Sequence, residues 1–216
     1  MRWLLLAVLA VLFLPRGVLA ADCIALDDFA RAKVGDFPAS WKLRKESGRK
    51  VYAVREEGDR RFLAAVSEGI GIQAAREQPW DIVAYPVLAW AWRLKEQPRG
   101  SDERQSKTND SALAVYAVWP HSSVSVKSLK YIWSAVVPRG TPLTSSAGLT
   151  QVKVLRSGSA PRGEWVEERV NVAEEFRARF NEAEVPKPAG IAVLTDADDT
   201  KSRAAGDYAS FRACRS

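Results

Sequence analysis

VLAWAWRLK, Val87–Lys95, is the stretch that decides the fold. Large apolar residues stand at every second position, the period of a β-strand, and share one face of the extended chain: Leu88, Trp90, Trp92 and Leu94. Further along, ALAVYAVW, Ala112–Trp119, is apolar on both faces. A strand of this kind is covered on both sides, so we expect it at the centre of a sheet. Together the two stretches predict a β-rich core.

Short strands separated by turn residues make up most of the remaining chain. Lys50–Arg55 and Arg61–Val66 flank the turn sequence Glu57-Gly58-Asp59, and this spacing predicts a hairpin. Four more stretches have the character of strands: Lys130–Val137, Gln151–Arg156, Gly190–Thr195 and Tyr208–Phe211. Many short strands punctuated by turns are typical of an antiparallel β-sandwich in the all-β class.

One short α-helix is expected within this sandwich. Asn171 is a good N-cap residue, and Glu174 follows it three positions later, as in a capping box. The segment also carries an apolar stripe at helical spacing: Val172, Phe176 and Phe180. No shift in composition marks a linker, so residues 21–216 are expected to form a single β-sandwich domain.

The first 20 residues, MRWLLLAVLAVLFLPRGVLA, predict a signal peptide. An early Arg2 precedes an apolar run, Trp3–Leu14, that is too short to span a bilayer. Small residues follow at the expected cleavage point, after Ala20 or Ala21. The protein is therefore expected to be periplasmic or secreted, without stable membrane insertion after cleavage. An uncleaved anchor or a buried N-terminal helix is the alternative.

The chain contains one histidine and two cysteines, which excludes metal sites and catalytic sets built on several such residues. In an oxidising compartment two cysteines usually pair, so we expect a disulfide between Cys23 and Cys214. Two unrelated free thiols are the alternative. The formal net charge of +6 is small and evenly scattered, which argues against a nucleic-acid partner.

The acidic loop Thr195–Thr200 is the best polar constellation in the sequence. Asp196, Asp198 and Asp199 offer hard oxygen ligands at a spacing that lets alternate residues face one ion. A structural calcium ion at the rim of the sandwich is the resulting hypothesis, and no other cofactor is expected. The alternative is a solvated turn in which the carboxylates bond nearby backbone amides.

Trp90, Trp92 and Trp133 form the best apolar constellation. Flat aromatic faces stack on the C–H surfaces of sugar rings, so these side chains could form a platform for a glycan. Tryptophans on alternating strands are also typical core residues, and this second interpretation stays open.

Acidic residues of the long polar segment before Ala112 are the third candidate group. Asp102, Glu103 and Asp110 could accept hydrogen bonds from sugar hydroxyls or supply a carboxylate pair for glycoside hydrolysis. A charged surface loop is the alternative. Arg169 lies on an expected strand, and we expect it to pair with one of these acids inside the sandwich.

In the order of its motifs, the chain resembles a bacterial family known only as domain of unknown function 3047. The resemblance rests on FPASW (Phe37–Trp41), YPVLAWAWRLK (Tyr85–Lys95), GSDER (Gly100–Arg104), NDSALAVYAVW (Asn109–Trp119), LKYIWS (Leu129–Ser134), VLRSG (Val154–Gly158), GEWVEERVNVAEEFRARF (Gly163–Phe180) and GIAVLTDADDT (Gly190–Thr200). It implies a jelly-roll sandwich similar to carbohydrate-binding domains. It implies no activity, because the family has none established.

The leading hypothesis for function is an exported, non-catalytic module that binds a polysaccharide or a cell-envelope glycan. Its expected ligand-binding residues are Trp90, Trp92, Asp102, Glu103, Asp110, Trp133, Arg169, Asp196 and Asp198. A glycan-active hydrolase with two of these carboxylates, or a structural envelope protein, is the alternative.

Overall fold

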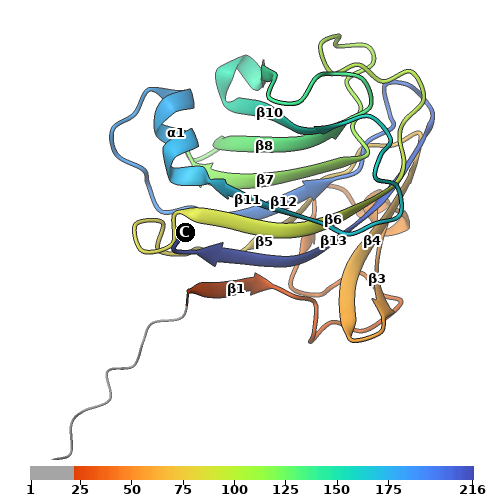
Figure 1. Ribbon diagram of the computed structural model, residues 1–216, viewed down its shortest axis with the longest axis horizontal. Helices are drawn as coiled ribbons and strands as arrows, with labels where there is room; N and C mark the ends of the chain where they lie inside the picture. Colours follow the sequence, from red (N-terminus) through yellow and green to blue (C-terminus); the bar gives the residue numbers. More distant parts are fainter. Residues whose placement is uncertain (1–21) are drawn as a thin grey trace, which may run out of the picture.

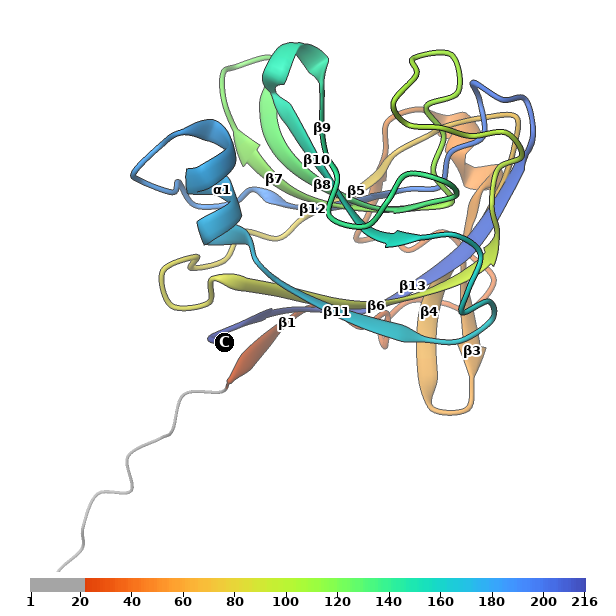
Figure 2. The ribbon, with the colours of Figure 1, turned by 45° about the horizontal axis from the view of Figure 1, so that its top comes forward.

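Two β-sheets stacked face to face form the body of the protein in the computed structural model, which describes residues 22–216. Sheet A has the strand order β11-β6-β13-β4-β3, and β1 also pairs with β13. Sheet B has the order β2-β5-β12-β7-β8-β10-β9. Figures 1 and 2 show the two layers, with sheet A below sheet B. The predicted signal peptide, residues 1–20, lies outside the described residues.

The strands have the following bounds. In sheet A they are β1 Cys23–Asp27, β3 Tyr52–Glu57, β4 Arg60–Glu68, β6 Val87–Glu96, β11 Val166–Asn171 and β13 Arg203–Cys214. In sheet B they are β2 Lys42–Leu43, β5 Ala74–Glu77, β7 Leu113–Pro120, β8 Val126–Ser134, β9 Pro142–Ser145, β10 Thr150–Ser157 and β12 Gly190–Leu194. Two short 3₁₀ turns, Glu46–Lys50 and Ser146–Gly148, lie in the connections.

The predicted all-β sandwich of jelly-roll type is confirmed, with one difference in strand direction. β3 and β4 form the predicted hairpin, and β7 occupies the expected central place between β12 and β8. β10 pairs with β8 in parallel, unlike the other pairings among the described strands. The short strand β9, antiparallel to β10, reverses the chain between them, and the sequence analysis had not predicted this strand.

The tryptophans of the predicted glycan platform lie in the core between the sheets. Trp90, Trp92 and Trp133 each have 0% of their surface exposed. The ring centroids of Trp90 and Trp92 are 5.4 Å apart, and those of Trp92 and Trp133 are 5.8 Å apart. The platform hypothesis is therefore wrong, because the face that these residues share on their strands is the one that the opposite sheet covers.

Helix α1, Val172–Phe180, closes one end of the sandwich beside β7, β8 and β11 (Figure 2). As predicted, the Asn171 side chain caps it by accepting a hydrogen bond of 3.1 Å from the backbone N–H of Glu174. Phe176 anchors the helix against Trp119, with ring centroids 4.7 Å apart. Within residues 22–216, no helix has the length and apolar character needed to cross a bilayer.

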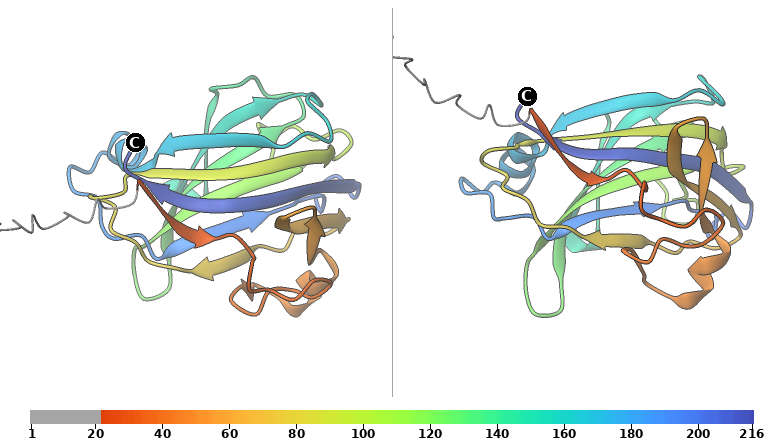
Figure 3. Two further views of the ribbon diagram at one scale, coloured as in Figure 1. Left: turned by 60° about the horizontal axis from the view of Figure 1, so that its bottom comes forward. Right: turned by 90° about the horizontal axis from the view of Figure 1, so that it is seen from below.

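The predicted disulfide is present and joins the two ends of the described chain. Cys23 on β1 stands opposite Cys214 on β13 in the strand register, and the two cysteines are 191 positions apart in sequence. Figure 3 shows β1 running beside β13 at the edge where the C-terminus lies. The bridge therefore fastens the first strand of sheet A to the last.

Candidate functional site

The outer face of sheet B, which we call the sheet B face, is the surface on which the candidate polar residues gather. Figure 2 shows sheet B bending upward along β8, β10 and β9. A cluster of buried, mostly aliphatic side chains lines this face: Ala114, Tyr116, Ile132, Val152, Val154 and Ala192. A cavity of about 30 Å³ opens here, lined by Glu103, Asn109, Lys130, Ile132, Leu143, Thr144, Ser145 and Val152.

Lys130 is a charged residue in the middle of this apolar face. It stands on β8 directly opposite Tyr116 of β7, and its Nζ lies 5.7 Å from the centroid of the tyrosine ring. Only 8% of its surface is exposed. Burial lowers the pKa of Lys130, but the surrounding groups, Tyr116 and Asp196 foremost, outweigh it and raise the pKa overall. The lysine is therefore charged at neutral pH.

A cluster of carboxylates lies beyond the end of β12. Asp110, Asp196 and Asp198 each place one carboxylate oxygen within 4.8 Å of the others. Burial, together with the nearby charge of Asp198, raises the pKa of Asp196 to about 7. The predicted calcium ligands thus come together in part: Asp196 and Asp198 belong to the cluster, and Asp110 stands where Asp199 was expected. Calcium binding itself stays a prediction.

Two tyrosines of sheet A hold the chain in place just before Asp196. The hydroxyl of Tyr208 donates a 2.8 Å hydrogen bond to the carbonyl of Leu194 and lies 2.9 Å from the hydroxyl of Thr195. The backbone N–H of Thr195 donates to the Tyr52 hydroxyl at 3.3 Å. Because both phenols are fixed by the opposite sheet, the position of Asp196 is tied to the core.

Gly71 forms the wall behind the Asp196 carboxylate. The two residues form an isolated antiparallel bridge. A Cβ atom added to Gly71 would lie 2.0 Å from Oδ1 of Asp196, far inside any allowed contact. The close approach of backbone to carboxylate therefore requires glycine, and it accounts for part of the burial that shifts the pKa of Asp196.

Asp110 connects the long polar loop to the acidic loop. Its carboxylate is fully buried and accepts hydrogen bonds from the backbone N–H groups of Asp199 at 3.2 Å and Thr200 at 2.8 Å. The Thr200 hydroxyl donates a third bond at 2.5 Å. Through these hydrogen bonds, Asp110 holds the long polar loop against the acidic loop Thr195–Thr200.

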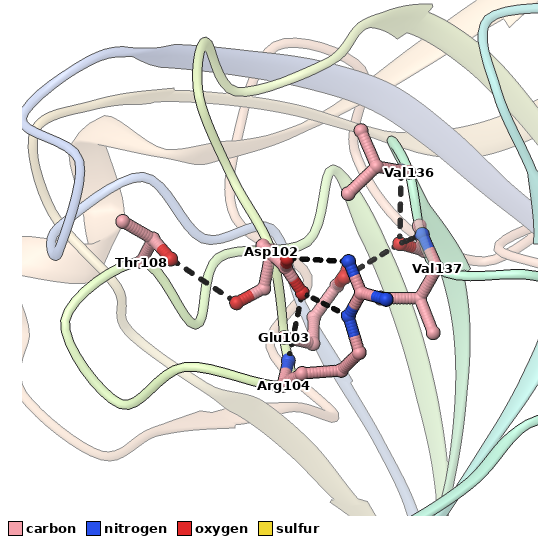
Figure 4. A network of polar contacts seen from close by, with 7 residues as sticks. Asp102, Glu103, Arg104, Thr108, Val136 and Val137 are labelled. Carbon is pink, nitrogen blue, oxygen red and sulfur yellow. Dashed lines mark hydrogen bonds and ion pairs between the residues drawn. The ribbon is translucent and has the colours of Figure 1, made fainter.

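Asp102 and Glu103 are likewise engaged within the protein, as Figure 4 shows. The Arg104 guanidinium donates to both oxygens of Asp102, at 2.8 and 2.6 Å, and lowers the pKa of that carboxyl to about 2. Glu103 is buried and accepts hydrogen bonds from the hydroxyls of Ser111 at 2.8 Å and Ser134 at 2.5 Å. Both carboxylates are therefore occupied by partners within the chain.

Arg169 does not pair with these acids, so the expectation for it is wrong. It stands opposite Ala89 on the edge strand β11, and its side chain is exposed. The guanidinium lies 3.8 Å from the sulfur of Cys214 and donates to the carbonyl of Ser216. The alternation of the strand directs Arg169 outward, away from the interior of the sandwich.

The family comparison agrees with the order of motifs in the sequence. The family model described as "Protein of unknown function (DUF3047)" matches residues 39–212. The chain belongs to this family. A comparison with curated proteins gives no match.

Among solved structures, the family member described here is similar to a family 12 glycoside hydrolase, with 10% identity and a TM-score of 0.36 over 82% of this chain and 98% of that one. It is also similar to the family 11 xylanase from Neocallimastix patriciarum, with 10% identity and a TM-score of 0.34 over 82% and 92% of the two chains. At these scores the likeness carries no argument about activity.

The structure thus separates the expected site residues into two sets. Asp110, Asp196 and Asp198 meet at one end of the sheet B face, and Glu103 lines its cavity. The tryptophans and Arg169 lie elsewhere. Lys130 was missed, although a lysine inside the apolar strand KYIWS is a signal that sequence alone provides.

Proposed function

We propose that this protein is a periplasmic or secreted binding module, exported by the signal peptide at residues 1–20, that holds a polysaccharide or cell-envelope glycan against the sheet B face. Residues 21–216 act as one domain in this proposal. The observation that carries it is a cavity on an apolar sheet face, lined by polar residues from the loop before β7 and from the strands β8 and β9. Apolar surface with a few well-placed polar groups is the usual composition of a ligand site.

Hydrogen bonds, rather than stacking on tryptophan, carry recognition in this proposal. Asn109 and Ser145 line the cavity and offer donors and acceptors that match sugar hydroxyls. Ile132 and Val152 form the buried apolar floor of the cavity, and the partly exposed Leu143 beside them offers apolar surface to the C–H groups of a sugar. The disulfide supports an oxidising location, because such bonds form and persist outside the cytosol.

A glycan array followed by calorimetric titration tests this function. Ser145→Ala removes a hydroxyl from the cavity lining, whereas Thr141→Ala removes one that bonds the carbonyl of Pro138 and does not line the cavity. We expect Ser145→Ala to weaken glycan binding several-fold and Thr141→Ala to leave it unchanged. Absence of binding to every polysaccharide on the array would overturn the proposal in favour of a structural envelope protein.

Hydrolysis by a carboxyl pair is a second candidate, and the raised pKa of Asp196 is the observation that favours it. A carboxyl with a pKa of about 7 still holds a proton near neutral pH and can donate it to a leaving oxygen. Asp198 is the available partner, since Asp102, Glu103 and Asp110 are committed to other bonds. Release of reducing ends by the native protein, lost in both Asp196→Asn and Asp198→Asn, would establish this activity.

A further inference from the structure

The burial and surroundings of Lys130 indicate the chemical class of the glycan. The residue is more than nine-tenths buried and lines the cavity of the sheet B face. Among the ion pairs formed by residues 22–216, none includes Lys130, although the exposed Lys42 and the half-buried Lys127 do form such pairs. The lysine with the least exposed surface thus lacks a carboxylate within 4 Å.

The groups that face Lys130 do not neutralise it at close range. Tyr116 is its hydrogen-bond neighbour, and burial raises the pKa of that phenol, so it stays neutral at neutral pH. Glu103 and Asp196 act on the lysine from a greater distance. Glu103 is occupied by two serine hydroxyls, and Asp196 lies against Asp198.

A buried ammonium without an ionic partner is costly, because the loss of hydration is not offset by a nearby opposite charge. The cavity beside it has a volume of about 30 Å³, which exceeds the roughly 10–15 Å³ that one water molecule needs. That space admits a small substituent and is too small for a sugar ring. Asn109 and Ser145 line it and can donate hydrogen bonds to such a substituent.

We propose that Lys130 binds the carboxylate of an acidic sugar, so that the ligand of the sheet B face is a carboxylated polysaccharide. This inference rests on the proposed glycan-binding function and deepens it. The sugar ring lies outside the cavity beside the partly exposed Leu143 of β9, and its carboxylate enters the cavity and pairs with Nζ of Lys130. A planar carboxylate is the smallest anionic group that glycans carry, which suits the size of the cavity.

Calorimetric titration with polygalacturonate and with its fully methyl-esterified form tests the inference, because the two polymers share a backbone and differ in the carboxylate charge. Alginate serves as a second carboxylated polymer. We expect the native protein to bind the acidic forms at least tenfold more tightly than the ester. Lys130→Met should abolish this preference, and Lys130→Arg should retain most of it.

Lys127→Met is the matched control, because Lys127 lies on the same strand, pairs with Glu182 and does not line the cavity. It should keep the preference for the acidic polymers. Equal binding of the acidic and esterified forms by the native protein would overturn the inference while leaving glycan binding intact. Binding of neutral glycans alone would do the same, and absence of all glycan binding would overturn both proposals. The comparison of ligands on the native protein holds even if Lys130→Met fails to fold.

Discussion

The outer faces of the two sheets each bury a charged side chain, but they treat it differently. On sheet A, Asp207 is fully buried and pairs with Arg93 at 2.7 Å and Lys95 at 2.8 Å. On sheet B, Lys130 is nearly as buried and faces the neutral hydroxyl of Tyr116. The sheet A charges pair within the chain, whereas Lys130 forms no ion pair with the described residues, and we propose that a ligand supplies its partner. Burial alone therefore does not distinguish a structural charge from a functional one.

Loss of the disulfide should have the largest effect on stability, because the bond closes nearly the whole described chain into one loop. The bond joins two strands of sheet A, so its loss should not alter the sheet B face. For a closed loop of 191 residues, chain entropy gives about 5 kcal/mol. Cys23→Ser with Cys214→Ser should lower the free energy of unfolding by that order in a denaturant titration. Glycan binding by the protein that remains folded should be unchanged. A loss of affinity would contradict the claim that the sheet B face binds the ligand independently of sheet A.

Asp207→Asn should cost about 3 kcal/mol, because removal of one partner leaves Arg93 and Lys95 beside a neutral amide on a buried face. Lys130→Met should leave stability unchanged or raise it by about 1 kcal/mol, since it breaks no close ion pair and removes a buried charge. Parallel urea titrations of the two variants measure this difference. Equal destabilisation by both would show that Lys130 is a structural charge like Asp207.

The pH dependence of stability should come largely from Asp196. Its pKa is raised from 3.8 to about 7 in the folded protein, so the folded state binds a proton that the unfolded state has released. This contribution to stability is complete below pH 4 and is lost as pH rises through 7. We expect a fall on the order of 2 kcal/mol between pH 4 and pH 8. Asp196→Asn should flatten the profile, and an unchanged profile would contradict the assignment.

Calcium should have the smallest effect, and it tests the hypothesis about the acidic loop. If the ion binds Asp110, Asp196 and Asp198, it replaces the proton on Asp196. Millimolar calcium should then raise the melting temperature by a few degrees at pH 8 and by less at pH 5. If titration with calcium produces neither heat nor a shift in the melting temperature, the hypothesis of a calcium site is wrong.

Local patterns predicted the fold well. The alternation of Val87–Lys95 separated the two faces of β6, and the Asn171 cap located the helix. The pairing of β8 with β10 could not be predicted, because β9 is a short strand rich in polar residues and has no apolar period. Sequence periodicity identifies the two faces of a strand, but not which of them meets the other sheet.

The site was predicted less completely, because its contacts join distant parts of the chain. Asp110 reaches Thr200 across 90 positions, so spacing within the acidic loop suggested Asp199 in its place. The tryptophans had the right chemistry for sugar stacking, but their strands turn them inward. Lys130 became conspicuous only once its burial and the lack of a close carboxylate could be seen together.

The central claim, that the sheet B face and not the sheet A face binds the ligand, is tested most directly by mapping NMR shifts on one sample. Ile132 carries a methyl reporter in the cavity, and the partly buried indole of Trp165 lies beside Arg93 on the outer face of sheet A. On addition of polygalacturonate fragments, the Ile132 methyl signal should shift and the Trp165 indole N–H signal should not. A shift at Trp165 with none at Ile132 would contradict the account.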